Sequence, residues 1–380
     1  MKVCVVCDVL GEENNGTSIA AMNLIRTLRS KGHTVNIICP DRQRASQEGF
    51  FVVPTLNLGP LNNYVTKNGV ALAKRDMNVI GRAMDGADAV HIMMPFALGG
   101  AAAKLARKRG LALTAGFHCQ AENFTGHIFL KDSRLAAKLT YKYFYKNVYR
   151  YCDKIHYPTQ FIRDTFEAVV GKTPGVVISN GVGSRFKPAD EPVKKPDGKY
   201  TLLFTGRYSP EKSHCVLIKA IALSRHVNDI NLILAGSGPK ADAIKKLVKK
   251  LDIPMPTMRF YGRDEMLDVI RSADLYVHPA EIELESIACL EAISCGIVPL
   301  IADSPRSATR LFALDDKNLF RYDDPADMAK KIDWWLEHPE ERAKRSREYA
   351  GYAHRFDFDS CMDEMEKMIC GAVEAKKHGG

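Results

Sequence analysis

Two successive alternations of strand-like and helix-like segments constrain the fold of this chain more than any other feature of its sequence. In the first half, apolar strand patterns and amphipathic helix patterns follow one another, the strands at 2–8, 33–38, 90–94 and 113–117 and the helices at 17–30 and 101–109. Parallel strands need a crossover helix between them, so this alternation predicts a parallel sheet with helices on both faces. We therefore expect an α/β fold whose first domain is doubly wound and Rossmann-like.

A second alternation follows a polar, proline-rich stretch at 187–199. Its predicted strands are 201–205, 231–235, 257–261, 275–278 and 298–302, and its predicted helices are 212–224, 242–251, 265–272 and 283–295. Residues 326–370 have a helical pattern throughout. We predict four parts: a domain over 1–186, a linker over 187–199, a second Rossmann-like domain over 200–355, and a helix over 356–380 that returns to the first domain.

Composition indicates a globular protein, with 46% hydrophobic and 26% charged residues among 380. No apolar run reaches the length that spans a membrane, and the apolar start of the chain is too short for a signal peptide. The ten cysteines are scattered through apolar segments, which is typical of reduced thiols in a cytoplasm. Cys4 and Cys7 form a CxxC string, but side chains at that spacing on a strand point to opposite faces, so we expect core packing rather than a metal site.

The positive charge lies in the first half of the chain. Residues 1–185 contain 24 Lys and Arg against 13 Asp and Glu, a balance of +11, whereas the remaining residues have 30 against 32, a balance of −2. An anionic partner is therefore expected for the first domain alone.

Glu283 and Glu291 lie eight residues apart around the predicted start of a helix at Ser286. Free backbone N–H groups at a helix start bind phosphate, and the two carboxylates could bind sugar and ribose hydroxyls on either side of it. This arrangement indicates a nucleotide-sugar site. The alternative is a solvated amphipathic helix that carries two glutamates.

Two further loops follow predicted strands of the second domain. Arg207 and Lys212 flank a tight turn after the first strand, where two cations suit a diphosphate. Gly236 begins a Gly-Ser-Gly-Pro turn after the next strand; it lacks the third glycine of a dinucleotide fingerprint and is expected to permit close backbone approach to a ligand.

In the first domain, Asn15, Gly16 and Thr17 lie in the loop that opens the first helix, and they could serve a ligand or simply cap the helix. His118 ends a strand in a polar cluster that includes Gln120 and Glu122. A lone histidine in such a position could be structural or functional, and the sequence alone leaves both possibilities open.

Six basic residues recur every four positions between 134 and 154, interleaved with aromatic residues: Arg134, Lys138, Lys142, Lys146, Arg150 and Lys154. On a helix they form a slowly winding basic ridge. The ridge could be a solvated face over an aromatic core, a nucleic-acid surface or an interfacial membrane helix. Because it belongs to the domain with the charge excess, we favour an anionic membrane surface and expect no nucleic acid.

Taken together, the two α/β domains, Gly16 after the first strand, Arg207 with Lys212, and Glu283 with Glu291 resemble glycosyltransferase family 4 and, within it, the bacterial glycolipid glucosyltransferases. The resemblance covers nearly the whole chain. It implies a retaining enzyme of GT-B fold, a UDP-sugar donor in an interdomain cleft and a lipid acceptor. It further implies a cytoplasmic protein that associates peripherally with the inner face of the cell membrane.

The resemblance also implies roles for individual residues. Arg207 and Lys212 would neutralise the diphosphate leaving group. Glu283 would hold the sugar hydroxyls and Glu291 the ribose. His118 would contact the sugar near the reacting carbon.

Other positions would shape the site around these side chains. The N–H groups of Ser286 and Ile287 would bind a phosphate, and backbone groups near Arg263 would meet the base. Gly16 would leave room for the phosphates. No metal or other cofactor is expected, because no Asp-x-Asp string follows a strand; Asp357-Phe358-Asp359 reads as a helix start.

The resemblance implies glucose as the sugar, and galactose is the alternative, because most of the family has Phe-Gly where this chain has Glu285-Ser286. The acceptor is equally open among sterol, diacylglycerol, ceramide, polyprenyl and saccharide hydroxyls. Retention without an evident protein nucleophile favours front-face displacement, in which charge on the departing diphosphate must be stabilised. A GT-B epimerase and a non-catalytic binding module remain the alternatives.

Overall fold

The computed structural model describes residues 1–10, 16–57, 59, 72–126, 130, 132–191 and 198–378, with the side chain of Arg263 excepted. It divides into two compact units. The first unit contains Met1–Asn180 and Asp359–Gly380, and the second contains Gly181–Phe358. The predicted boundaries at 186 and 355 lie a few residues from these divisions. Asn15 and residues 192–197 of the predicted linker lie outside the described residues.

The first unit is built on a seven-stranded sheet in the order β3-β2-β1-β4-β5-β6-β7, with every neighbouring pair parallel. Its strands are β1 (Lys2–Val6), β2 (Thr34–Cys39), β3 (Phe50–Val52), β4 (Ala89–Ile92), β5 (Ala112–Gly116), β6 (Lys154–Tyr157) and β7 (Gly175–Val177). The sequence patterns predicted β1, β2, β4 and β5. They missed the other three, which are only three or four residues long and carry too few side chains for a clear period.

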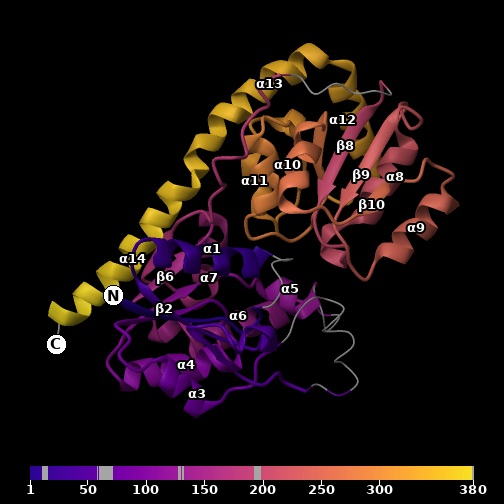
Figure 1. Cartoon of the computed structure of the whole chain (residues 1–380). Coiled ribbons are helices and arrows are strands. Elements are labelled where there is room, and N and C mark those ends of the chain that lie inside the picture. Colours follow the sequence, from indigo (N-terminus) through magenta and orange to yellow (C-terminus); the bar gives the residue numbers. More distant parts are fainter. Residues whose placement is uncertain are drawn as a thin grey trace. The chain divides into compact units, whose positions relative to one another are not determined.

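Helices connect these strands (Figure 1). They are α1 (Gly16–Ser30), α3 (Met77–Ala83), α4 (Ala97–Lys108), α5 (Ala121–Gly126), α6 (Arg134–Asn147) and α7 (Gln160–Val170), with short 3-10 turns η1 (Arg42–Arg44) and η3 (Tyr149–Tyr151). The predicted apolar stripe of α1 is present, since Met22, Ile25 and Leu28 are all buried. An amphipathic helix of this kind is stabilised mainly by burying its stripe against the sheet.

The second unit has a six-stranded parallel sheet in the order β10-β9-β8-β11-β12-β13. Its strands are β8 (Tyr200–Thr205), β9 (Ile230–Ala235), β10 (Thr257–Arg259), β11 (Leu275–His278), β12 (Pro299–Asp303) and β13 (Leu319–Arg321). Its helices are α8 (His214–Leu223), α9 (Ala241–Lys250), α10 (Arg263–Arg271), α11 (Ile287–Ser294), α12 (Pro325–Glu337) and α13 (Pro339–Tyr352), with the 3-10 turns η4 (Pro210–Lys212), η5 (Ala308–Phe312), η6 (Asp316–Asn318) and η7 (Ala353–Phe356). Both sheets therefore have the doubly wound order of a Rossmann domain, as predicted.

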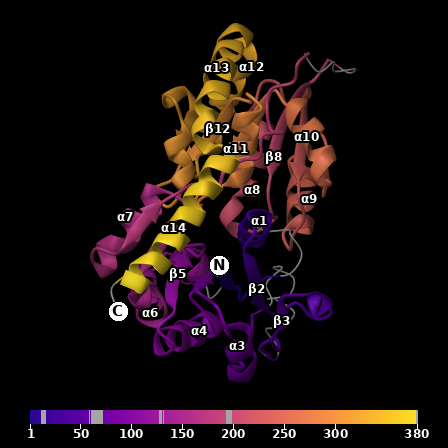
Figure 2. The same ribbon diagram turned by 60° about the vertical axis from the view of Figure 1, so that its left-hand side comes forward.

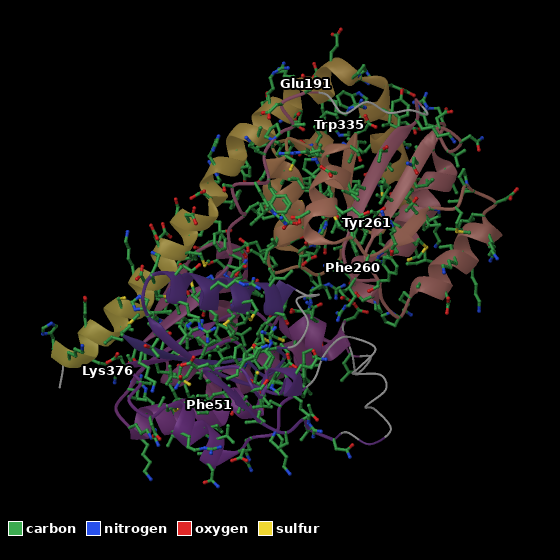
Figure 3. All side chains as sticks on the ribbon, viewed as in Figure 1. Phe51, Glu191, Phe260, Tyr261, Trp335 and Lys376 are labelled. Carbon is green, nitrogen blue, oxygen red and sulfur yellow. The ribbon has the colours of Figure 1, made fainter. Side chains whose placement is uncertain are left out.

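Trp335 anchors the helical end of the second unit (Figure 3). Its side chain is buried, and its indole N–H donates to the carbonyl oxygen of Lys317 at 2.9 Å. Trp334 packs edge-on against it, 4.8 Å between ring centroids, with the ammonium of Lys317 over its face. The two tryptophans therefore pack together at the end of the second unit, Trp335 buried and Trp334 half-buried.

The last helix, α14 (Phe358–His378), packs within the first unit (Figure 2). Met362, Met365, Ile369 and Val373 form its buried stripe, at the spacing of three and four residues that one helix face requires. Among the described helices, none combines the length and the apolar character needed to cross a bilayer.

Candidate functional site

The candidate residues of the second unit gather at one edge of its sheet. Arg207 follows β8, Gly236 follows β9, Glu283 follows β11, and Arg306 follows β12. Since all these strands are parallel, their carboxyl ends meet at the same edge. The sheet order reverses between β8 and β11, and in open α/β sheets such a switch point is where ligands bind.

Gly236 allows the loops after β8 and β9 to touch. A Cβ atom at this position would lie 2.1 Å from the carbonyl oxygen of Gly206, and φ of Gly236 is 156°. Two backbone hydrogen bonds join the same loops, from Tyr208 N to Ser237 O at 2.8 Å and from Lys240 N to Tyr208 O at 3.0 Å. The structure shows a close approach of Gly236 to the neighbouring loop, and the predicted approach to a ligand stays a prediction.

Lys212 and Glu283 form an ion pair across this edge. Their side chains are only 18% and 13% exposed, so water screens the pair weakly. His278, the last residue of β11, lies 3.6 Å from the same Glu283 oxygen, Nε2 to Oε1. Burial, and then the charge of Lys212, hold the pKa of His278 well below its usual value, so the ring is neutral and the Glu283 charge is balanced by Lys212.

Arg207 is also paired within its own loop. Its guanidinium donates to Glu211 at 3.1 Å, and the Ser209 hydroxyl donates to the same carboxylate oxygen. Burial alone would raise the pKa of Glu211, but the Arg207 charge and the Ser209 hydrogen bond hold it below its usual value. The carboxylate therefore stays ionised and fixes Arg207 at the edge.

Arg306 is a third cation at this edge, and the sequence reasoning missed it. It pairs with Glu281, which is 2% exposed. Its carbonyl oxygen accepts from Glu283 N at 3.4 Å, and Ala308 N donates to Glu283 O at 2.9 Å, so the loop after β12 supports Glu283 directly. Arg306 follows a predicted strand, as Arg207 does, so the same sequence criterion could have identified it.

Ser286 marks the start of α11. Its φ of 67° is left-handed, and its hydroxyl accepts from Cys289 N at 3.4 Å as an N-cap. The helix begins at Ile287 with Ser286 as its N-cap, close to the start predicted at Ser286, and the segment 283–285, which the wider range 283–295 included, is a loop with the buried Glu285. Glu291 lies in the second turn of α11, and Arg263 begins α10.

In the first unit, His118 belongs to a cluster of three buried histidines. It follows β5 and packs edge-on against His156 of β6, 5.5 Å between ring centroids. A Cβ atom on Gly116 would lie 2.4 Å from His118 Nε2, so only glycine leaves room for the ring. His91 of β4 completes the cluster and contacts the Thr114 hydroxyl through Nδ1 at 2.9 Å.

These three histidines are neutral. Burial lowers the pKa of His91 to about 3 and that of His156 to about 4. Burial, followed by the two neighbouring rings, holds the pKa of His118 well below its usual value. His118 is therefore suited to hydrogen bonding rather than to carrying a charge.

The other candidates of the first unit lie close to the same edge. Gln120 is buried, and Glu122 on α5 accepts a 2.7 Å hydrogen bond from Tyr141 on α6. Gly16 and Thr17 form the first turn of α1, and a Cβ atom on Gly16 would meet nothing within 4 Å. The hydrogen bond to Tyr141 gives Glu122 a structural task, which joins α5 to α6.

Asp8 is a buried carboxyl that sequence reasoning did not single out. It lies just beyond β1 and accepts from Leu98 N and Gly99 N, both at 3.2 Å, in the first turn of α4. Burial, partly offset by these hydrogen bonds, raises its pKa to about 7. The only sequence signal was an acid at the end of an apolar strand.

The basic ridge is shorter than predicted. Arg134, Lys138, Lys142 and Lys146 are exposed on α6, but Arg150 lies in η3 and Lys154 begins β6. The continuous helix over 134–154 is therefore wrong, because the chain must turn to enter the sheet. Beside the four basic residues, three large apolar side chains are exposed at the same spacing: Leu135 (68%), Leu139 (58%) and Tyr143 (50%).

Comparison with known proteins now bears on this geometry. Residues 14–184 match the family model Glycosyltransferase Family 4, and residues 186–351 match the model Glycosyl transferases group 1. The chain belongs to glycosyltransferase family 4. The resemblance expected from the sequence is thereby confirmed, and each model corresponds to one Rossmann-like unit.

Among curated proteins, the chain is similar to a GDP-mannose-dependent alpha-mannosyltransferase of Corynebacterium glutamicum, with 26% identity over 78% of this chain and 71% of that protein. It is also similar to an alpha-monoglucosyldiacylglycerol synthase of Streptococcus pneumoniae, with 24% identity over 57% of this chain and 51% of that protein.

Two solved structures complete the comparison. Sucrose-phosphate synthase from Thermosynechococcus elongatus has a TM-score of 0.76 at 16% identity, with 98% of this chain and 99% of that chain covered. The catalytic domain of cholesterol-alpha-glucosyltransferase from Helicobacter pylori is 48% identical over 41% of this chain and 98% of that chain, with a TM-score of 0.40. The first match confirms the predicted GT-B fold, two Rossmann-like domains in one chain.

Proposed function

We propose that this enzyme transfers a hexose, glucose or galactose, from a UDP-sugar to a hydroxyl group of a membrane lipid such as a sterol or diacylglycerol, with retention of configuration. The observation that carries the proposal is the placement of Arg207 and Lys212, both partly buried, at the ligand-binding edge of the second unit with Glu283 beside them.

The two cations would stabilise the departing diphosphate. Lys212 is held by Glu283 in the structure, and a bound diphosphate would offer the ammonium a stronger anionic partner. Glu283 would then be available to accept hydrogen bonds from sugar hydroxyls. Because charge accumulates on the diphosphate as the glycosidic bond breaks, these contacts strengthen in the transition state and accelerate the reaction.

The remaining residues fit around this centre in the proposal. The first N–H groups of α11, at Ser286 and Ile287, would bind a phosphate, and Glu291 would bind the ribose. His118, neutral and buried, would exchange a hydrogen bond with a substrate hydroxyl. In front-face displacement the acceptor proton passes to the leaving phosphate, so no protein base is required and no metal is expected.

The lipid acceptor is supported by the name of the pneumococcal relative, whose product is a glucosylated diacylglycerol. The corynebacterial relative depends on GDP-mannose, so GDP-mannose is the alternative donor that must be tested against a UDP-sugar.

The exposed face of α6 supports peripheral attachment to the inner face of the cell membrane. Leu135, Leu139 and Tyr143 could enter the interface while Lys138 and Lys142 meet anionic headgroups. Each such lysine contributes roughly 1 kcal/mol near an anionic surface, so the four basic residues of α6 suffice for reversible binding.

A matrix of donors and acceptors tests the reaction. Purified enzyme is incubated with UDP-glucose, UDP-galactose or GDP-mannose, each with sterol, diacylglycerol or ceramide, and products are identified by mass spectrometry and their anomeric configuration by NMR. We expect one α-hexosyl lipid from a UDP-sugar. Turnover with GDP-mannose alone, epimerisation without acceptor, or UDP binding without any turnover would each contradict the proposal.

A separate experiment tests attachment to the membrane. Changing Lys138, Lys142 and Lys146 to Glu should abolish co-sedimentation with anionic liposomes. The matched control changes three exposed lysines of α9, Lys245, Lys246 and Lys249, and should sediment like the wild type. Equal sedimentation of both variants would show that α6 is only a solvated face.

A further inference from the structure

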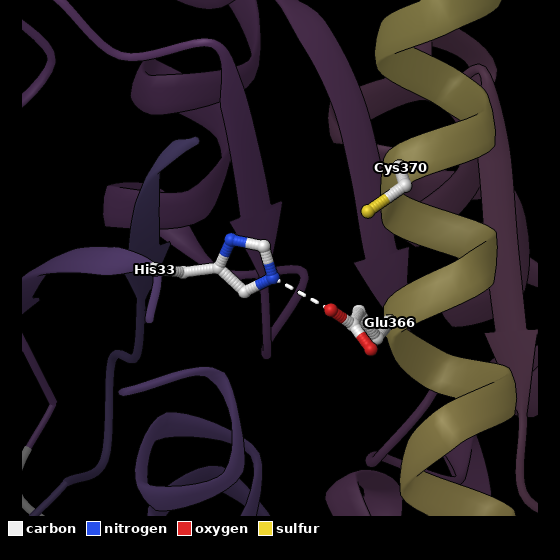
Figure 4. Close-up of side chains that lie close together, drawn as sticks. All are labelled: His33, Glu366 and Cys370. Carbon is white, nitrogen blue, oxygen red and sulfur yellow. Dashed lines mark hydrogen bonds and ion pairs between the residues drawn. The ribbon is translucent and has the colours of Figure 1, made fainter. Parts of the chain in front are cut away.

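Three side chains with metal-binding atoms lie close together in the structure although His33 is more than 300 positions from the other two in the sequence (Figure 4). His33 lies between α1 and β2, and Glu366 and Cys370 lie four residues apart on α14. Residues at this spacing share one helix face, so α14 presents its carboxylate and thiol together toward the histidine. All three belong to the first unit.

The distances are those of a nearly assembled site. One ligand atom from each residue lies within 4.8 Å of the other two, and His33 Nε2 is 2.7 Å from Glu366 Oε1. The His33 and Glu366 side chains are 13% and 24% exposed, and Cys370 is partly buried. Within the described part of the chain, these three side chains are close enough to share one metal ion.

We propose that His33, Glu366 and Cys370 bind a zinc ion. Nitrogen, thiolate and carboxylate oxygen are the ligands that zinc takes in proteins, and three protein ligands leave a fourth tetrahedral position for water. Zinc at about 2.0–2.1 Å from nitrogen and oxygen requires the ligand atoms to stand about 3.3 Å apart. His33 and Glu366 therefore need to separate by only about 0.6 Å from their hydrogen-bonded position.

Neighbouring groups hold the proposed ligands in position. Glu366 Oε2 accepts from Lys31 at 2.6 Å, which orients the carboxylate and leaves Oε1 toward His33. Outer hydrogen bonds of this kind hold metal ligands in place. His33 Nδ1 lies 3.3 Å from the amino group of Met1, so both ring nitrogens have defined neighbours.

Charge and protons balance on binding. Zinc takes Nε2 of His33 in the tautomer whose proton is on Nδ1, and the Met1 amino group beside Nδ1 first releases a proton to solvent so that it can accept this N–H. The Cys370 thiol likewise releases its proton to solvent to become a ligand. One thiolate and one carboxylate then neutralise the two positive charges of zinc. The Lys31 ammonium beside Glu366 is also paired with Asp363, whose carboxylate offsets its charge.

Cobalt reports on the proposed ligands because a cysteine thiolate bound to Co²⁺ gives a near-ultraviolet charge-transfer absorption. The intact, reduced, metal-free protein should bind one equivalent of Co²⁺ with this absorption and lose it when Zn²⁺ is added. Cys370→Ser should lack the absorption, and His33→Gln should weaken Co²⁺ binding at least about tenfold. The matched controls Cys215→Ser, at an exposed cysteine, and His226→Gln, at a histidine paired with Glu337, should behave as the wild type.

Thermal unfolding distinguishes zinc binding from a simple hydrogen-bonded clamp. Zinc should raise the Tm of the wild type and of both controls but not that of Cys370→Ser. If the wild type gives no thiolate absorption, or if zinc leaves its Tm unchanged while His33→Gln lowers it, the cluster is only a clamp between His33 and α14 and the proposal is wrong. Neither measurement depends on the proposed transferase activity.

Discussion

The two Rossmann-like units share a strand order but carry opposite chemistry at corresponding edges. At the carboxyl ends of β8, β11 and β12, the second unit has three ion pairs, Arg207–Glu211, Lys212–Glu283 and Arg306–Glu281. At the carboxyl ends of β4, β5 and β6, the first unit has neutral, buried histidines. One backbone plan therefore supports an edge with paired charges and an edge with neutral histidines.

The difference matches what each proposed reactant demands. A diphosphate leaving group needs fixed positive charge, and the carboxylate partners keep the cations in place until it binds. A substrate hydroxyl carries no charge, so a neutral histidine can bind it without the cost of burying an ion. The fold supplies the edge, and a few side chains decide which reactant it serves.

The largest effect should follow removal of a charge from the second unit. Lys212→Ala should lower kcat/KM about 10²- to 10³-fold, since loss of one group that stabilises transition-state charge has that effect. The control is Lys219→Ala, at an exposed lysine of α8, which should remain near wild type.

Because Lys212→Ala also leaves Glu283 without its cation, stability needs a separate check. The double variant Lys212→Ala with Glu283→Gln should recover thermal stability but not activity. Near-normal transfer by either folded variant would remove Lys212 from the proposed mechanism.

A smaller effect should follow from disturbing the loops that hold these charges. Gly236→Ala places a Cβ atom 2.1 Å from Gly206 O in a backbone conformation that favours glycine, and such strain costs about 1–3 kcal/mol of stability. Gly262→Ala is the control, because a Cβ atom there meets nothing within 4 Å. Urea unfolding of the two variants compares them, and equal stabilities would show that the loops need no close approach.

The neutral edge predicts a pH effect confined to the first unit. The pKa of His156 falls from 6.5 to about 4 on folding. Between these two values the unfolded chain binds a proton that the folded chain does not, so the free energy of unfolding is full above pH 6.5 and decreases as pH falls toward 4. The titration of His156 alone lowers the free energy of unfolding by about 2 kcal/mol between pH 7 and pH 5. His156→Gln should therefore lose about 2 kcal/mol less than the wild type over that range.

Asp8 acts in the opposite direction, because its pKa is raised to about 7 and its protonation on acidification stabilises the fold. The term is common to wild type and His156→Gln, so it cancels when their urea-unfolding curves are compared. His226→Gln, in the second unit, is the control. Parallel losses in wild type and His156→Gln would mean that folding leaves the pKa of this ring unchanged.

The smallest effect should be that of a chelator on transfer. EDTA should change the initial rate by less than about twofold, because the proposed leaving-group contacts come from Arg207 and Lys212 rather than from a metal. Zinc removed from His33, Glu366 and Cys370 should lower the Tm instead. A rate that requires added Mg²⁺ or Mn²⁺ would place a metal at the charged edge.

The sequence by itself determined the architecture of both units. Long apolar strands such as β1 and β8 and the apolar stripe of α1 have a period that local reading detects, so the parallel sheets followed from their alternation. The same reading placed Arg207 and Lys212 beyond a strand end. Short strands such as β7, and the break in the basic ridge after Asn147, depend on neighbouring strands and could not be read locally.

Only the tertiary structure decided which side chains meet. Glu281 and Arg306 are separated by 25 positions, and His33 and Glu366 by 333, so no local pattern links them. Their contacts arise because parallel strands bring distant loops to one edge and because α14 returns to the first unit. Burial, too, is a property of the packed state, and it is what makes His118 neutral. The hydrophobic period of a segment depends on which of its faces packs on the core, so it can be read from the local sequence. Side-chain pairing and pKa shifts depend on residues that the rest of the chain brings next to the segment.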